Sequence, residues 1–164
     1  DRPSRPHDLS FPYSVRLSLW PWRWLYFDPE PPQVGADAPA EIARGAYLVE
    51  SLGHCGECHT PRNWLGARDE DRKLAGNLDG PEGDKVPNIT PDPDTGLGSW
   101  SREDVIRVLE TGLLPDFDAV GGAMGEVVRA TSKLTGEDRA AIAAYLATVP
   151  PVPNPESPAT QPEF

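Results

Sequence analysis

The feature that most constrains this chain is the pentapeptide at residues 55–59, which has the form C-x-x-C-H. Two thiols separated by two residues can each add to one vinyl group of a haem, and the histidine that follows is then held beneath the iron as a proximal ligand. Cys55 and Cys58 are the only 2 cysteines, so the motif leaves no thiol for a disulfide framework. We therefore predict one covalently bound haem c, with His59 as an axial ligand.

Three other interpretations of the motif are weaker. A thioredoxin-like C-x-x-C needs a βαβ context with hydrophobic strands, and none is visible around residues 55–59. A zinc site needs a fourth ligand, and the remaining histidines, His7 and His54, are poorly placed to supply one. A structural disulfide between the two cysteines would leave His59 unexplained. Haem attachment is the prediction that accounts for all three residues.

Composition is consistent with a small protein built around a cofactor. The 164 residues have room for one domain plus extensions, and 20 prolines and 15 glycines indicate much irregular structure. Only 38% of the residues are hydrophobic, and a haem would add a large apolar body to the core. The formal net charge of −11 disfavours nucleic acid and anionic membrane surfaces as partners and favours a basic docking patch on a protein. A solvated acidic surface needs no partner at all.

Cellular location is inferred from the motif. No stretch approaches the ~20 consecutive apolar residues of a transmembrane helix. No signal peptide is visible, and Asp1 has the character of the start of a processed or trimmed chain. Because haem is attached to C-x-x-C-H outside the bacterial cytoplasm, we expect a periplasmic protein, either soluble or on the periplasmic face of the inner membrane. An anchor removed before Asp1 stays open.

Residues 1–39 form an N-terminal extension. Within the aromatic run at 11–27, Trp20, Trp22 and Trp24 alternate, so they would share one face of an extended chain. Pro21 argues against a helix here. So many rings are costly to leave in water, and we expect them to cover something: the chain's own domain, a partner subunit, or a membrane interface. Residues 28–39 are expected to form a proline-rich linker.

Three helices are expected in the domain at residues 40–150. The first begins near Pro39, with Asp37 or Ala38 as cap, and ends near Gly53. The second follows the cap Ser101 and ends at Gly112, and the third runs from a cap at Thr135 to the prolines at 150 and 151.

The segments between the helices are expected to be loops. Residues 55–63 should form a short helical turn at the haem edge. Residues 65–100, rich in Gly, Pro, Asp and Asn, predict a long ordered loop over the haem. Residues 113–129 are a glycine-containing passage that carries the single methionine. A proline-rich tail, residues 151–164, is expected to be loose or draped over the surface.

The second axial ligand has several candidates, namely His7, His54, Met124, a lysine, or none. His54 adjoins Cys55 on the attachment side, and His7 lies in a flexible proline-rich arm. Met124 stands between two expected helices in a loop with Gly121, Gly122 and Gly125, where a core-filling role is less natural. A thioether is a soft, uncharged ligand that raises the potential relative to bis-histidine ligation. We predict Met124.

The order of motifs resembles a known family. The motifs are RGAYL at 44–48, C-x-x-C-H followed by Thr60-Pro61-Arg62, PNITPD at 87–92, TGLGSWS at 95–101, the Met124 segment and AAYL at 143–146. The chain resembles a class I c-type cytochrome of the mono- and dihaem-variant type. It is most similar to a single haem module of the cytochrome c subunits of membrane-bound alcohol, gluconate and fructose dehydrogenases, over about residues 40–150.

The resemblance implies an all-α, cytochrome c-like fold, with three or more helices around one covalent haem. It implies close approach of the first and last helices at Gly45, with Tyr145 packed there. The haem site would comprise Cys55 and Cys58 as thioether links, His59 and Met124 as iron ligands, and Asn88, Ile89 and Trp100 on the propionate side. Arg62 would lie near a propionate or be an ordinary solvated arginine.

Two departures from the family concern the partner. The dehydrogenase subunits carry three haem modules and this chain has one motif, and the aromatic segment is expected to lie outside the shared module. The function that follows is a monohaem c-type cytochrome. It would pass single electrons from a periplasmic or membrane-bound dehydrogenase or respiratory complex to a downstream acceptor, with residues 11–27 as a possible docking segment for a partner subunit.

No acid/base pair, nucleophile motif or phosphate loop is present, so the chain is not expected to be an enzyme. The alternative is a haem enzyme or gas-binding sensor with a displaceable sixth ligand. Met124 discriminates between the two, because a methionine bound to iron closes the open position.

Overall fold

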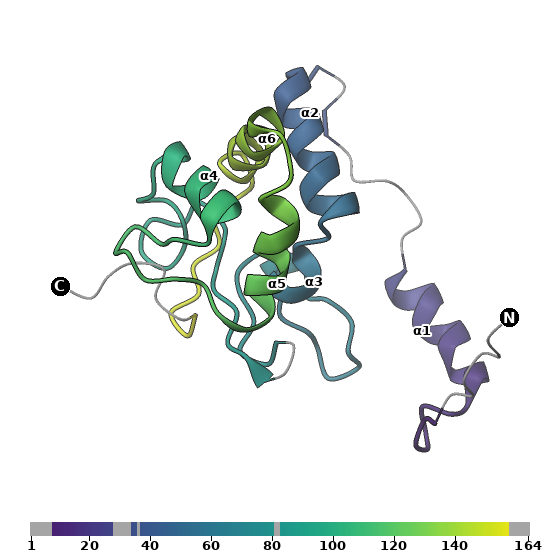
Figure 1. Cartoon of the computed structure of the whole chain (residues 1–164). Helices are drawn as coiled ribbons and strands as arrows, with labels where there is room; N and C mark the ends of the chain where they lie inside the picture. The colour runs from purple at the N-terminus through teal and green to yellow at the C-terminus, as the bar shows by residue number, and fades with distance from the viewer. Residues whose placement is uncertain (1–7, 28–33, 36, 81–82, 158–164) are drawn as a thin grey trace, which may run out of the picture. The chain divides into compact units, whose positions relative to one another are not determined.

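The computed structural model describes residues 8–27, 34, 35, 37–80 and 83–157. Two compact units are present, Asp1–Pro31 and Pro32–Phe164. Within the described part of the chain the regular elements are helical, and β-pairing is limited to isolated bridges. Figure 1 shows the α-helices α1 (Leu19–Tyr26), α2 (Ala40–Ala46), α3 (Gly56–His59), α4 (Arg102–Thr111), α5 (Gly122–Thr131) and α6 (Gly136–Leu146). The expected all-α class is confirmed.

The first unit contains a helix where the sequence argued against one. The 3-10 turn η1 (Arg16–Ser18) leads into α1, and Pro21 is the third residue of α1. The first-turn N–H groups of a helix have no intrahelical acceptor, so proline costs little there, and the prediction of no helix was wrong. Residues two apart point to different sides of a helix. Trp20 therefore shares a side with Trp24, and the Trp22 ring lies 5.5 Å from the Tyr26 ring.

In the second unit α2 packs against α6, as Figure 1 shows. A Cβ at Gly45 would collide with the carbonyl oxygen of Ala141 and lie 2.7 Å from Cβ of Tyr145. Only glycine permits this approach, so the expected crossing at Gly45 and Tyr145 is confirmed. The ion pair of Arg44 and Asp138 (2.7 Å) joins the same two helices at the surface.

The first helix of this unit differs slightly from expectation. Its N-cap is Pro39, so Asp37 and Ala38 lie outside it, and Ala40 is its first residue. After Ala46 the helix continues as the π-helical turn η2 (Tyr47–Leu52), and the chain leaves it at Gly53, as expected. The wider turn brings the backbone directly to the haem motif, where the N–H of Cys55 donates to the carbonyl of Val49 (2.9 Å).

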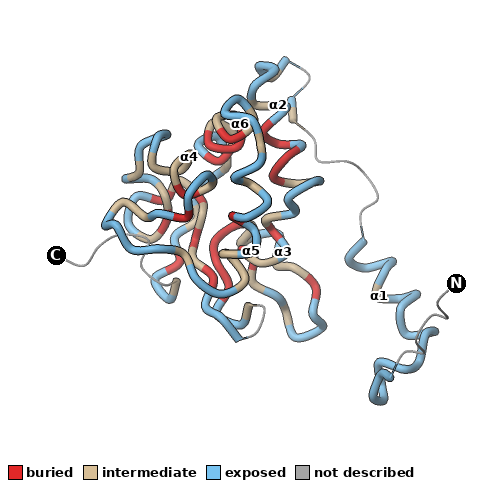
Figure 2. The backbone as a smooth tube through the Cα atoms, in the orientation of Figure 1, coloured by how far each residue is buried: buried red, intermediate tan, exposed pale blue. Residues whose placement is uncertain are grey.

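The core lies between α2, its π-helical continuation and α6. Figure 2 shows buried residues on α2 and α6 and also along the loops of this unit. Partly buried apolar side chains surround the buried ones, among them Cys55, Ile89, Leu97, Val105 and Leu109. The buried hydrophobic cluster consists of Leu48, Val49, Leu74, Ile142 and Leu146.

Local capping explains where α4 and α6 begin. Ser101 and Asp104 form a reciprocal capping box at α4, which ends at Gly112 with φ 76°. The hydroxyl of Thr135 accepts from the N–H of Asp138 at the start of α6. Both caps were expected from the sequence, and both are confirmed because they depend only on residues three apart.

The segment from 113 to 129 does not remain a loop. Its second half forms the ten-residue helix α5, which begins after the N-cap Gly121. The glycines had suggested flexibility, but Val127 and Val128 follow Met124 at helical spacing and Val128 is buried. Met124 is therefore the third residue of a helix, and its expected place in a flexible loop was wrong.

In the described residues of 65–100 the chain forms a long loop that includes the 3-10 turn η3 (Glu70–Arg72). The C-terminal tail is hydrogen-bonded to this loop. The side chain of Asn154 is 2% exposed and donates to the carbonyl of Ala75 (2.7 Å), and its backbone N–H donates to the hydroxyl of Thr95 (2.9 Å). Residues 152–157 are thus anchored, not loose, and residues 158–164 lie outside the described range. The limits of the predicted domains, 1–39, 40–150 and 151–164, stay predictions.

None of the helices in the described ranges is both long enough and apolar enough to cross a membrane.

Candidate haem-binding site

The C-x-x-C-H motif forms one helical turn. Cys55 is the N-cap of α3, and its carbonyl accepts from the N–H of Cys58 (3.2 Å) and of His59 (3.0 Å). Residues at positions i, i+3 and i+4 lie on one face of a helix. The two thiols and the imidazole therefore project from the same face. Both cysteines are free and half-buried.

The ring of His59 is held in one tautomer. It is buried, and its Nδ1 lies 2.8 Å from the carbonyl oxygen of Pro87. A carbonyl only accepts, so Nδ1 carries the proton, and Nε2 keeps its lone pair for a metal. Burial lowers the pKa of His59, against the opposing effect of the Pro87 carbonyl. The imidazole is thus kept neutral, which is the form that binds iron.

The loop that carries Pro87 is fastened to the motif helix. The carbonyl of His59 accepts from the N–H of Gly76 (2.7 Å), and the hydroxyl of Thr60 accepts from the N–H of Leu74 (3.0 Å). Asn77 and Val86 then pair in a short bridge through two backbone hydrogen bonds, of 2.9 and 2.7 Å. This pairing turns the chain back and delivers the Pro87 carbonyl to the ring of His59.

Asn88 secures the next peptide of this loop. Its amide donates to the hydroxyl of Thr95 (3.0 Å) and to the carbonyl of Val152 (2.8 Å). Its side-chain oxygen accepts from the N–H (2.9 Å) and the hydroxyl (2.8 Å) of Thr90. The side chain is fully buried and both of its donors are used. Asn88 has no side-chain donor left for a propionate, and its place on that side of the haem stays a prediction about the loop that it shapes.

Cys55 lies in an apolar setting beside a buried carboxylate. Burial raises the pKa of the Cys55 thiol to about 11, and the nearby charge of Glu50 acts in the same direction. The side chain of Glu50 is 5% exposed, and it accepts from Lys73 Nζ (2.8 Å) and the hydroxyl of Tyr145 (2.8 Å). The thiol is therefore neutral at pH 7, and Glu50 is satisfied by partners from the loop and α6.

Met124 lies in the first turn of α5 and is half-buried. Gly122, two residues earlier, has φ 54°, and a Cβ there would collide with the carboxylate of Asp84. The start of α5 thus lies directly against residues 83–86, the segment that leads to Pro87. The same loop therefore contacts the ring of His59 and the helix of Met124. The role of Met124 as a ligand stays a prediction.

The remaining predicted residues lie around the motif. Arg62 donates to the carboxylate of Glu57 on α3 (2.6 Å) and to the carbonyl of Gly66 (2.8 Å). Ile89 packs against the core cluster, and Trp100 is half-buried, with its backbone N–H on the carbonyl of Leu97 (2.9 Å). Arg62 is therefore part of the scaffold of the motif. Its role near a propionate, and those of Ile89 and Trp100, stay predictions.

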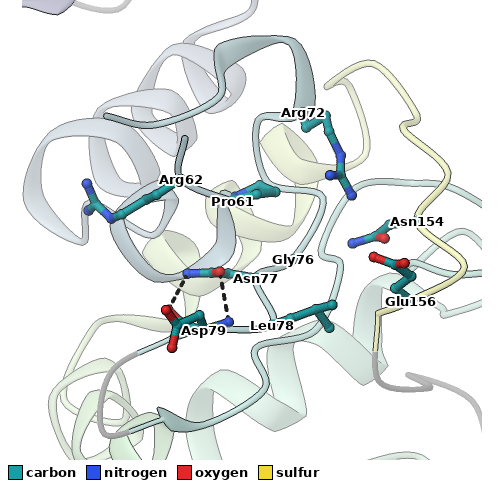
Figure 3. Close-up of a pocket in the computed structure, with 9 residues that line it drawn as sticks. All are labelled: Pro61, Arg62, Arg72, Gly76, Asn77, Leu78, Asp79, Asn154 and Glu156. Carbon is teal, nitrogen blue, oxygen red and sulfur yellow. Dashed lines mark hydrogen bonds between the residues drawn. The ribbon is translucent and has the colours of Figure 1, made fainter. Parts of the chain in front are cut away.

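A pocket of about 220 Å³ lies beside the segment that follows the motif. Figure 3 shows its lining, which includes Pro61, Arg72 and Glu156, and the two hydrogen bonds of 3.1 Å between the Asn77 side chain and the backbone of Asp79. The two cysteines of the motif, His59 and Met124 do not line this pocket. It is a hollow between the loop and the tail, separate from the donor cluster.

Sequence reasoning missed one contributor to the site and one buried residue away from it. Pro87 acts through its main-chain carbonyl, which every residue possesses, so no side-chain signal marks it. Arg139, buried in α6, bonds Glu110 in α4 and Thr131 at the end of α5, and in the sequence it is an ordinary arginine in a helical pattern. Its burial could be expected only from its position one residue before the apolar stripe of α6.

The residues present fit a covalently attached haem. Two unpaired thiols and an imidazole share one face, the imidazole nitrogen available to a metal is Nε2, and the surrounding side chains are apolar and only partly covered. Thiols that accept vinyl groups and a neutral imidazole that binds iron are the donor set of haem c.

Comparison with known proteins gives the same family. A family model described as Cytochrome c matches residues 42–150. A protein of Cereibacter sphaeroides described as "Diheme cytochrome c-type" is 52% identical over 153 residues, which are 93% of this chain and 50% of that protein. The cytochrome c subunit of an alcohol dehydrogenase (quinone) from Gluconacetobacter polyoxogenes is 41% identical over 163 residues, 93% of this chain and 34% of the subunit.

A third relative is the fructose dehydrogenase cytochrome subunit of Gluconobacter japonicus, 38% identical over 151 residues, 92% of this chain and 31% of that subunit. The chain thus spans about half the length of the dihaem relative and about a third of the two dehydrogenase subunits. A match over 93% of 164 residues leaves no more than 12 outside it, so residues 13–27 fall within it. The aromatic segment lies outside the residues that the family model matches, and the similarity to the dihaem relative nevertheless extends over residues 13–27.

Proposed function

The chain belongs to the cytochrome c family, and we propose that it carries one haem c and passes single electrons between a dehydrogenase and a downstream acceptor. The observation that supports this most directly is the hydrogen bond of His59 Nδ1 to the Pro87 carbonyl, 2.8 Å long. It presents Nε2 of a neutral imidazole on the same helical face as two free thiols. The motif occurs once in the chain, which supports one haem.

Each residue of the site has a defined part. When bound, haem c supplies a one-electron Fe(III)/Fe(II) couple. Cys55 and Cys58 hold it through thioether bonds, and His59 binds from the attachment side. Met124 would be the further iron ligand, and a thioether favours a higher potential than a second histidine would. The Pro87 carbonyl orients the ring of His59 and increases its basicity, which tunes the metal.

The relatives suggest the partner and the compartment. Two of them are cytochrome subunits of alcohol and fructose dehydrogenases, so the donor proposed for this chain is a dehydrogenase in or facing the periplasm. A relative about twice as long is described as dihaem. The haem of this chain would then be one of a series through which electrons pass in turn.

The aromatic segment, defined as residues 11–27, is proposed as the docking element for a partner subunit. Helix α1 is apolar on nearly every side, and its rings are mostly exposed, with Trp20 at 75% and Trp24 at 84%. A helix that is apolar all round needs cover on several sides. A protein surface can enclose it, whereas the surface of a bilayer covers one side, so a protein partner is favoured.

Met124→Ala tests the assignment of the electron carrier. The variant should lose the methionine-to-iron charge-transfer band, have a lower reduction potential, and bind carbon monoxide readily when ferrous, because the sixth position is no longer closed. Val127→Ala, on an exposed side chain of the same helix, is the matched control and should resemble the wild type. An unchanged band and potential in Met124→Ala would reject Met124 as ligand, and a denaturing gel without covalent haem stain would reject the proposal as a whole.

A further inference from the structure

Arg139 is a buried cation that no part of the proposed electron-transfer chemistry uses. The residue lies in α6 and is 7% exposed. Its Nη1 lies 2.5 Å from the carbonyl oxygen of Leu134, 3.3 Å from that of Ser132 and 3.4 Å from that of Thr131. Its Nη2 bonds the carboxylate of Glu110 at 2.5 Å. The guanidinium of Arg139 thus lies within hydrogen-bond distance of three main-chain carbonyls and one carboxylate.

These acceptors lie at the end of α5, in α4 and, for Leu134, in the short turn between α5 and α6. Thr131 is the last residue of α5 and Ser132 is its C-cap, while Glu110 lies in α4. The last carbonyls of a helix have no intrahelical partner, and a cation there also interacts favourably with the helix dipole. Arg139 therefore joins α4, α5 and α6 at a single point.

Two further contacts fix the C-terminal half of α5. The hydroxyl of Thr131 donates to the carbonyl of Leu109 in α4 (2.6 Å), and Val128 is buried. At the opposite end no side chain caps the helix at Gly121, and Gly122 packs closely against the carboxylate of Asp84. Met124 is seven residues before Thr131, which is about 10 Å along a helix that rises 1.5 Å per residue. A rigid helix held at its C-terminal end transmits its orientation to the methionine.

We propose that Arg139 is a positioning residue, which sets the direction of α5 and thereby holds the thioether of Met124 towards the haem iron. The inference rests on the proposed function, because it requires Met124 to be the sixth ligand. Arginine suits the task because its planar fork reaches the carbonyls and the Glu110 carboxylate at once. Lysine, a single point charge with three donors, cannot span both.

The test compares Arg139→Lys and Arg139→Met with the wild type and with Met124→Ala, all as haem-loaded full chains. The measurements are the intensity of the methionine-to-iron charge-transfer band, the reduction potential, and the fraction of ferrous protein that binds carbon monoxide. They are made at a temperature where circular dichroism shows native helix content. Both Arg139 variants should weaken the band, lower the potential towards that of Met124→Ala, and bind carbon monoxide several-fold more than the wild type.

Two further variants complete the test. Arg107→Met removes a half-buried arginine of α4 that pairs with Asp104 (2.5 Å), and should leave all three measurements unchanged. Glu110→Gln keeps an acceptor for Nη2 and should fall between the wild type and Arg139→Lys. If Arg139→Met does not fold, Arg139→Lys and Glu110→Gln test the role of Arg139.

The outcomes separate the two proposals. Folded Arg139 variants with the band, potential and carbon monoxide binding of the wild type would overturn the role of Arg139 alone, provided that Met124→Ala shows its expected change. If Met124→Ala itself changes nothing, Met124 is not the ligand, and both the ligand assignment and the role of Arg139 fail.

Discussion

Helices α6 and α1 are both rich in apolar residues, but α6 is packed in a core and α1 is not. In α6, Ala141, Ile142, Ala143 and Leu146 are buried, whereas α1 has no buried residue. The two helices differ in the size of their side chains and in whether another element packs against them. The small side chains of Ala141 and Ala143 allow α2 to approach α6 to the limit set by Gly45, whereas the tryptophans of α1 need a groove shaped to receive them. Apolar composition alone therefore does not decide whether a helix belongs to a core.

A substitution should therefore have a different kind of effect in each of the two units. The α2–α6 crossing is determined by contacts within the chain, so a change there should be measured in stability. The aromatic segment contributes little buried area to its own unit, so a change there should be measured in binding. Three substitutions, in order of decreasing effect, test that division.

Gly45→Val should give the largest effect. The new side chain has no space against the Ala141 carbonyl and the Tyr145 side chain, so the two helices must separate. We expect a loss of about 3 kcal/mol in the free energy of unfolding, typical of severe overpacking. Denaturant unfolding of the haem-loaded protein, followed by circular dichroism, measures it.

The control for this substitution is Gly136→Ala at the open start of α6, where a Cβ would meet nothing within 4 Å. It should change the stability by no more than about 0.5 kcal/mol. Equal losses in both variants would show that the helix crossing is not limited by space at Gly45.

Asp138→Asn should have a smaller effect that depends on pH. The hydrogen bond from Arg44 lowers the pKa of Asp138 below its usual 3.8, so the folded state favours the charged form. The stabilisation is fully present above the unfolded-state pKa and is lost as the pH falls through the lower folded-state pKa. Wild type should exceed Asp138→Asn in melting temperature near pH 7, and the gap should close in acid.

The neighbouring exposed residue provides the comparison, since Glu137→Gln changes a charge in the same turn without touching Arg44. Its difference from wild type should lack the acid-dependent closure. A pH-independent gap in Asp138→Asn would mean that the ion pair with Arg44 does not contribute to the crossing.

Replacing Trp20 and Trp24 together by serine should change the stability of the second unit by less than about 0.5 kcal/mol, because both rings are exposed. The same variant should lose association with the partner subunit in co-purification. A large fall in melting temperature would instead show that the aromatic segment covers the chain's own domain, and would reject its role in docking.

Local signals were sufficient for much of the fold. The C-x-x-C-H turn, the caps Ser101 and Thr135, and the end of α4 at Gly112 all depend on residues within one or two turns of each other. The Gly45 crossing came from resemblance to a family, and the structure shows the reason for it. Met124 and Pro21 were misjudged because glycine and proline were interpreted by average preference, whereas position in the first helical turn removes most of their cost.

The predictions that failed or were missing concern groups that act across the chain. The tail at 152–157 is anchored by the buried Asn154, and Arg139 reaches three carbonyls of residues 131–134 and Glu110 on another helix. The hydrogen-bond acceptor of His59 is a main-chain carbonyl 28 residues away. No spacing rule identifies such partners. The path of the loop determines which carbonyl lies near the side chain, and the residue type does not.

The sequence by itself determined the chemistry of this protein: two thiols and an imidazole at the spacing of one helical turn, a single methionine, and helices delimited by their caps. These depend on covalent order and on short-range hydrogen bonds. Only the tertiary structure decided which nitrogen of His59 is available, which residues hold the helix of Met124, and which apolar helix is left uncovered. Those properties depend on groups brought together by packing, and the chain order does not specify their distances.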